Sequence, residues 1–156
     1  KKIEKILKKF ENQYNVLWLS MMKKKLNLNQ EHKKDINLIK ELLDIMYVFK
    51  LDYTNTFSDI QNRCNDKYNF MKEWNLKFEE RKKLNKKNEE CTNINPYIIP
   101  RNHIIDKILK ESDNNYFNKF EDLVNLLKTP YNNNISEKYT KPPKEEEKIH
   151  QTFCGT

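Results

Sequence analysis

Apolar residues recur at intervals of three to four positions along most of this chain, which is the spacing of one face of an α-helix. The pattern predicts a first amphipathic helix from about Ile3 to Leu26, which is expected to bury one continuous apolar stripe. A second helix is predicted to begin near Asp35, where an acidic side chain favours a helix N-terminus. It is expected to end at Lys50 and Leu51.

The middle of the chain predicts two further helices. Residues 52–56 are rich in side chains that cap helices, and Thr56 with Asp59 is typical of a capping arrangement for a short helix through Arg63. The next helix is predicted to begin near Asn65. Its apolar side consists of Phe70, Met71, Trp74, Phe78 and Leu84. The polar run from residue 81 to 87 is interpreted as a solvated helix end.

Prolines organise the last third of the chain. Pro96 and Pro100 exclude a regular helix between them, and Pro100 fits the first turn of a helix that reaches about Glu111. A last helix is predicted over residues 117–127, and the stretch after Pro130 is expected to be extended. The predicted fold is therefore all-α, an irregular bundle of about five to six helices over residues 1–128 with an extended C-terminal tail over residues 129–156.

The charge is +7, which raises the question of nucleic-acid binding. All but three of the 30 basic residues are lysine, and base recognition relies more on the guanidinium group of arginine. The dispersed lysines are interpreted as a solvated surface, so nucleic acid is not the expected partner. No apolar run approaches the ~20 residues of a transmembrane helix, and no membrane partner is expected.

The chain has few residues suited to catalysis. Its single glycine is Gly155, so it lacks the glycine-rich loop that cradles phosphates, and the segment alone is not expected to bind or turn over ATP. His150 and Cys154 are four residues apart, but two ligands fall short of a tetrahedral set, and no metal site is expected. Cys64 and Cys91 are interpreted as buried or incidental thiols.

Five short segments follow one another in the second half of the chain. They are Asn95-Pro96, Ile99-Pro100-Arg101-Asn102-His103, Lys128-Thr129-Pro130-Tyr131, the Pro142-Pro143 stretch with its acidic residues, and the terminal Thr152-Phe153-Cys154-Gly155-Thr156. Together they resemble the C-terminal region of the selenoprotein O family, which has similar segments in the same order. Two earlier pieces, residues 22–28 with Lys25-Leu26 and residues 52–57, are also similar to the family. The resemblance spans most of the chain.

The resemblance implies a protein adenylyltransferase with a kinase-like fold, which transfers AMP from ATP to Ser, Thr or Tyr hydroxyls of proteins and uses Mg²⁺ or Mn²⁺. The nucleotide and metal residues would lie upstream of Lys1, so this chain would be the helical region behind a kinase-like core, with no catalytic residue of its own. The start at Lys1 is interpreted in the same way, as a cut piece of a longer protein. Family members in eukaryotes are typically mitochondrial, which is the expected location.

Cys154 stands where family members carry a terminal cysteine or selenocysteine, and the resemblance implies a redox-regulatory role for it. Arg101 and Asn102 are expected to dock their helix onto the core through charge-assisted hydrogen bonds; the alternative is that Asn102 satisfies the first amides of that helix. The alternative function is a non-enzymatic, basic helical module that binds an acidic partner or nucleic acid.

Overall fold

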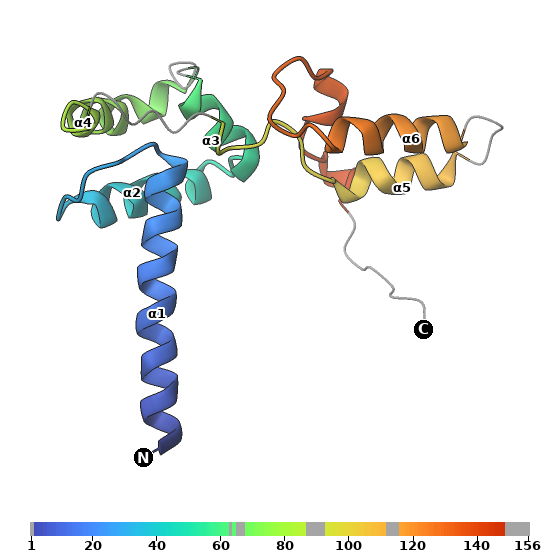
Figure 1. The fold of residues 1–156 in the computed structure, drawn as a ribbon. Helices are drawn as coiled ribbons and strands as arrows, with labels where there is room; N and C mark the ends of the chain where they lie inside the picture. Colours follow the sequence, from blue (N-terminus) through green and yellow to red (C-terminus); the bar gives the residue numbers. More distant parts are fainter. Residues whose placement is uncertain (1, 63, 65–67, 87–92, 112–115, 149–156) are drawn as a thin grey trace. The chain divides into compact units, whose positions relative to one another are not determined.

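A computed structural model describes residues 2–62, 64, 68–86, 93–111 and 116–148. The chain divides into two compact units, residues 1–95 and 96–156. Within the described ranges the secondary structure is helical, with six α-helices, short 3₁₀ turns and no strand (Figure 1). The predicted all-α class is confirmed. The predicted boundary between helices and tail at residue 128 stays a prediction.

The first helix, α1 (Lys2–Lys25), has the predicted length but not the predicted burial. Met22 and Leu26 are buried at its C-terminal end, whereas the large apolar side chains from Ile3 to Leu17 are exposed. Figure 1 shows the helix extending away from α2, α3 and α4, which form the rest of the unit. The expected burial of one continuous stripe is therefore wrong, because only the last two turns of α1 reach the core.

The core of the first unit lies between α2 (Asp35–Val48) and α4 (Lys72–Lys82), with α3 (Tyr53–Gln61) and the 3₁₀ turn η2 (Asn69–Met71) beside them. Trp74 is 2% exposed and lies at its centre. The indole Nε1 donates a hydrogen bond of 2.8 Å to the Leu38 carbonyl, and the ring stacks on Phe78 with 4.8 Å between centroids. The buried cluster consists of Met22, Leu26, Leu28, Leu38, Ile39, Leu42, Met46, Phe57, Ile60, Met71, Trp74 and Phe78.

Two helices of this unit end in the same backbone motif. After α1, Asn27 adopts a φ of 53°, and the amides of Asn27 and Leu28 donate to the carbonyls of Lys24 and Lys23. After α2, Lys50 adopts a φ of 49°, and Leu51 donates to Met46. Both are Schellman endings, in which a left-handed residue satisfies the last helix carbonyls. They end the helices sharply without glycine.

Two of the predicted helix starts in this unit are displaced. The N-cap of α3 is Asp52, whose Oδ1 accepts a 2.9 Å hydrogen bond from the Asn55 amide, and not Thr56. Asp52 takes this position because its backbone is extended, as an N-cap requires, while Thr56 is already helical. The helix predicted from Asn65 begins only at Lys72, after the 3₁₀ turn η2.

Tyr68 precedes η2, and its surroundings predict how the stability of the first unit changes at alkaline pH. Its hydroxyl donates a 2.7 Å hydrogen bond to Asp59, and burial, then this bond and the charges of Asp59 and Asp52, raise the pKa of Tyr68. An unfolded tyrosine loses its proton near pH ~10, where the folded Tyr68 still holds it, so stability falls as the pH rises above about 10. Urea unfolding at several pH values should show a smaller fall for Tyr68→Phe than for the wild type.

The control for this prediction is Tyr47→Phe, because Tyr47 is 86% exposed and its removal deletes one phenol without touching the core. This variant should lose stability with pH in parallel with the wild type. If Tyr68→Phe also runs parallel to the wild type, the bond to Asp59 does not hold the proton.

The second unit is a helical hairpin in which α5 (Asn102–Lys110) and α6 (Tyr116–Leu127) lie side by side (Figure 1). Among its described residues, the buried apolar ones are Ile98, Ile104, Ile108 and Leu123. The segment before α5 is fixed by the amide of Tyr97, which donates to the Pro130 carbonyl at 2.8 Å. The N-cap of α5 is Arg101, so Pro100 precedes the helix instead of lying in its first turn.

The described stretch after α6 is irregular and contains two short 3₁₀ turns, η3 (Glu137–Tyr139) and η4 (Glu145–Glu147). Ile135 and Tyr139 pack against the small core of the hairpin. Among the helices in the described ranges, none has the length and apolar character needed to cross a membrane.

Candidate functional site at the Asn95 junction

Three of the segments singled out in the sequence meet at one point of the first unit. Lys25 comes from the end of α1, Tyr53 and Phe57 come from α3, and Asn95 comes from the Asn-Pro pair at the end of the unit. Nothing in the apolar periodicity predicted this meeting, because the segments are up to 70 residues apart. We refer to Lys25, Tyr53, Phe57 and Asn95 as the Asn95 junction.

Asn95 is 1% exposed and uses both ends of its side chain. Its Nδ2 donates to the carbonyls of Lys25 at 2.7 Å and Phe57 at 3.2 Å. Its Oδ1 accepts a 3.2 Å hydrogen bond from Lys25 Nζ, and its backbone amide donates to Gln61 Oε1 at 3.0 Å. One asparagine therefore ties the ends of two helices to the last residue of the unit.

The Lys25 amine lies over two aromatic rings. Its Nζ is 5.3 Å from the centroid of Tyr53 and 5.1 Å from that of Phe57, within the range of a cation–π contact. Burial lowers the pKa of Lys25 because removal from water disfavours the charged form. The Tyr53 hydroxyl completes the junction by contacting Met22 Sδ at 3.6 Å.

Replacement of Asn95 by leucine should destabilise the first unit. The leucine fills a similar volume but leaves the half-buried carbonyl of Lys25, at the end of α1, without the side-chain amide that donates to it, and an unsatisfied buried polar group costs roughly 1–3 kcal/mol. Urea unfolding followed by tryptophan fluorescence reports on this unit, since both tryptophans, Trp18 and Trp74, belong to it. The exposed Asn12→Leu on α1 is the matched control and should change stability by less than about 0.5 kcal/mol. Equal stabilities of the two variants would contradict a positioning role for Asn95.

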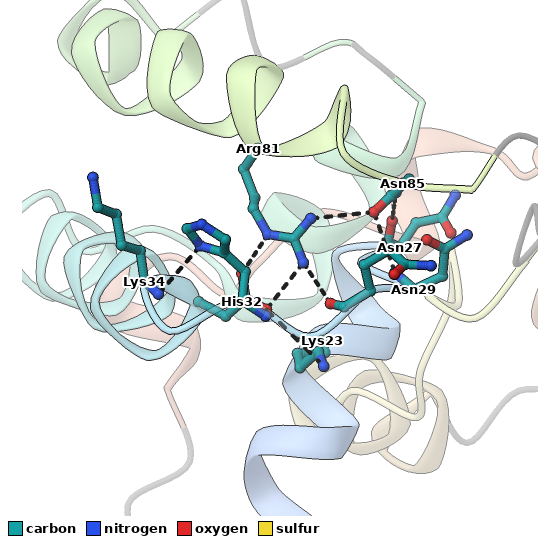
Figure 2. A network of polar contacts seen from close by, with 9 residues as sticks. Lys23, Asn27, Asn29, His32, Lys34, Arg81 and Asn85 are labelled. Carbon is teal, nitrogen blue, oxygen red and sulfur yellow. Dashed lines mark hydrogen bonds and ion pairs between the residues drawn. The ribbon is translucent and has the colours of Figure 1, made fainter.

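A second buried polar network joins α4 to the loop between α1 and α2 (Figure 2). Arg81 is 5% exposed and Asp35 is 2% exposed. The guanidinium binds the carboxylate through two bonds, Nε to Oδ1 at 2.5 Å and Nη2 to Oδ2 at 3.0 Å. Nη2 also donates to the Gln30 carbonyl. This bidentate pairing uses the planar fork that arginine alone provides.

Asn85 extends the network from Arg81 to the end of α1, as Figure 2 shows. Its Oδ1 accepts from Arg81 Nη1 at 3.4 Å, and its Nδ2 donates to the Asn27 carbonyl at 2.6 Å. Asn27 is the left-handed residue that ends α1. The network therefore connects the end of α4 to the end of α1 and to the start of α2.

The interpretation of residues 81–87 as a solvated helix end is wrong for Arg81. The sequence contained a signal that could have corrected it, because Met71, Trp74, Phe78 and Arg81 follow one another at intervals of three and four residues. Arg81 therefore continues the buried face of α4. Its partner Asp35, 46 residues earlier, could not be identified from the spacing.

The residues selected from the sequence have different surroundings. Arg101 is buried in the second unit, and its backbone carbonyl accepts from the amides of Ile104 and Ile105, whereas the Asn102 side chain is exposed. Their docking role stays a prediction. Cys64 is an exposed free thiol, so the first of its two interpretations, a buried thiol, is wrong. Cys154, Cys91 and His150 lie outside the described residues.

The chemistry available at the two networks is that of positioning. Each holds its charges in buried or half-buried hydrogen bonds between helix ends, so these charged groups are already paired within the first unit. In the part of the chain that the structure describes, no group of three or more His, Cys, Asp or Glu residues is arranged to hold a metal ion.

Comparison with known proteins places this chain in a family. The family model described as "Protein adenylyltransferase SelO" matches residues 1–128. The chain is 36% identical to the protein nucleotidyltransferase YdiU of Clostridium perfringens, over 98% of this chain and 34% of that protein. It is 39% identical to the YdiU protein of Pelagibacter ubique and 37% identical to that of Bacillus anthracis, over 96% of this chain and 33% of each.

The chain spans about a third of the length of these curated relatives. No solved structure matches it.

Proposed function

Because this chain belongs to the SelO family of protein adenylyltransferases, we propose that it forms the helical C-terminal third of an enzyme that transfers AMP from ATP to Ser, Thr or Tyr hydroxyls of proteins. The observation that carries the proposal is the family match over residues 1–128. The names of the relatives, which are nucleotidyltransferases of proteins, support it.

In the proposed reaction a substrate hydroxyl oxygen attacks the α-phosphorus of ATP. The bond to the β-phosphate oxygen breaks, pyrophosphate leaves, and the hydroxyl proton passes to a base. Such transfers depend on positioning and on neutralisation of phosphate charge by cations and basic side chains. The remainder of the longer chain would hold ATP and Mg²⁺ or Mn²⁺, and this segment would supply a rigid support through the Asn95 junction and the Arg81 network.

The hydroxyl targets are tested by mass spectrometry of proteins incubated with the full-length enzyme, ATP and Mg²⁺ or Mn²⁺. The proposal expects peptides that carry AMP on Ser, Thr or Tyr side chains. AMP found on lysine or histidine nitrogen instead would contradict the hydroxyl assignment while leaving nucleotide transfer in place.

We further propose that Cys154 forms a reversible disulfide with a cysteine in the remainder of the chain. A small disulfide such as oxidised glutathione would accept the two electrons and the two thiol protons, and would leave as two molecules of reduced glutathione. The proposal is supported by the resemblance of residues 152–156 to the family segment that carries a terminal cysteine or selenocysteine.

AMP transfer by the full-length enzyme should then differ between oxidised and reduced glutathione, and Cys154→Ser should abolish the difference. Cys64→Ser is the matched control, because Cys64 is an exposed thiol in the first unit. If the wild type transfers AMP equally in both conditions, Cys154 is not a regulatory thiol.

A further inference from the structure

The N-terminal five turns of α1 carry an apolar stripe that the described residues of the first unit leave open. The exposed fractions of its members range from 43% to 74%. They are Ile3, Ile6, Leu7, Phe10, Tyr14, Leu17 and Met21. Apart from Ile6, they follow one another at alternating intervals of four and three residues, so they lie on one face of the helix. We refer to these seven residues as the α1 stripe.

The α1 stripe is large for a surface that faces water. With about 150–200 Å² per large apolar side chain and the exposed fractions above, it offers on the order of 700 Å². The largest apolar patch of a typical monomer is about 300–600 Å². The stripe is closer to the ~800 Å² that one partner contributes to a standard protein interface. Its size indicates that another surface covers it.

The pattern of the stripe favours a globular surface over a second copy of the same helix. In a coiled-coil numbering with Leu7 and Tyr14 at position a, the flanking e positions hold Glu4 and Glu11. The flanking g positions hold Ile6, Gln13 and Ser20, so two copies would have no complementary charges there. Ile6 also widens the stripe beyond a narrow coiled-coil seam, as in helices that pack against a globular core.

The relatives supply the candidate surface. The chain covers 33–34% of their length, so about two thirds of a relative lies outside the matched part. We propose that the α1 stripe packs against the remainder of the longer chain and joins the helical third to the nucleotide-binding part of the enzyme. This inference rests on the proposed function. The buried C-terminal turns of α1, with Met22 and Leu26, would hold the helix in place in the first unit.

The test is hydrogen–deuterium exchange of the full-length enzyme. Amides of residues 3–17 should exchange at least about a hundredfold more slowly than unstructured amides, because a covered helix opens rarely. An uncovered helix end of this length is marginal in water and should exchange nearly as fast as unstructured chain. Fast exchange of residues 3–17 in the full-length enzyme overturns the proposal, and this outcome requires no variant to fold.

A matched pair of variants tests the stripe itself. Phe10→Asp introduces a charge into the stripe and should accelerate exchange of residues 3–17 at least about tenfold. Asn12→Asp places the same charge on the exposed opposite face and should leave exchange unchanged. Equal effects of the two variants would contradict the proposal. Protection that disappears when a dimer is diluted to monomer, with the mass followed by light scattering, would identify a second copy as the occupant and overturn it too.

The inference and the proposed function fail separately. If the enzyme transfers AMP while residues 3–17 exchange rapidly, the proposed function is supported and the docking surface is contradicted. If these residues exchange slowly but no AMP is transferred, the docking surface is supported and the proposed function is contradicted.

Discussion

Replacing Arg81 with alanine is expected to lower the free energy of unfolding of the first unit by about 3–5 kcal/mol, because it leaves a buried charge without its partner. The Asp35 carboxylate is 2% exposed and receives two hydrogen bonds from the guanidinium. The neighbouring ammonium of Lys23 is 4.0 Å from Asp35 and cannot replace them. The carbonyl of Gln30 loses its donor in the same variant.

The measurement is urea unfolding followed by tryptophan fluorescence. Lys77→Ala is the control on the same helix, because Lys77 forms an ion pair with Glu41 in which both side chains are exposed. It should cost less than about 1 kcal/mol. Arg81→Lys should recover only a small part of the loss, since an ammonium cannot form the bidentate pair. If Arg81→Ala and Lys77→Ala were equally stable, the buried pair would not join α4 to the start of α2.

Trp74→Ala is expected to produce a loss of similar size, about 3–5 kcal/mol, by leaving a cavity in the core. Trp74 is 2% exposed, and its ring stacks on Phe78. The variant also removes the donor to the Leu38 carbonyl, which ties α4 to α2. Because the variant loses a fluorescent probe, its unfolding is followed by circular dichroism of the helices.

Leu76→Ala is the control for the cavity, because Leu76 lies two residues along α4 and is 70% exposed. This variant should change the free energy of unfolding by less than about 0.5 kcal/mol. An effect of Trp74→Ala no larger than that of Leu76→Ala would mean that α4 does not pack on α2 as described.

The helices were largely predictable because their apolar residues follow a local period. The ends of α1 and α6 agree closely with the predicted limits, and α2 begins at the predicted Asp35. The start of α4 was not predictable to the same degree. A 3₁₀ turn that buries Met71 precedes the first turn of α4. Residues three positions apart share a face in a 3₁₀ turn and also in an α-helix, so the apolar spacing did not separate the two.

The candidate site was predictable only in part. Lys25, residues 52–57 and Asn95 were singled out separately, by resemblance to a family, and the hydrogen bonds of Asn95 show that they belong together. Contacts over 70 residues leave no periodic signal in one sequence. For the α1 stripe the sequence did predict the apolar face, because it follows a helical period. That period does not say whether the face is covered by this unit or by another surface.

The most direct test of the proposed function is label transfer by the full-length native chain with Mg²⁺ or Mn²⁺ and ATP labelled at either the α or the γ phosphate. Nucleotide transfer predicts that protein acquires label from the α position only, because pyrophosphate carries the γ label away. Label from the γ position only would mean phosphate transfer. No labelling from either position, under oxidising or reducing conditions, would contradict the enzymatic function and favour a basic helical binding module.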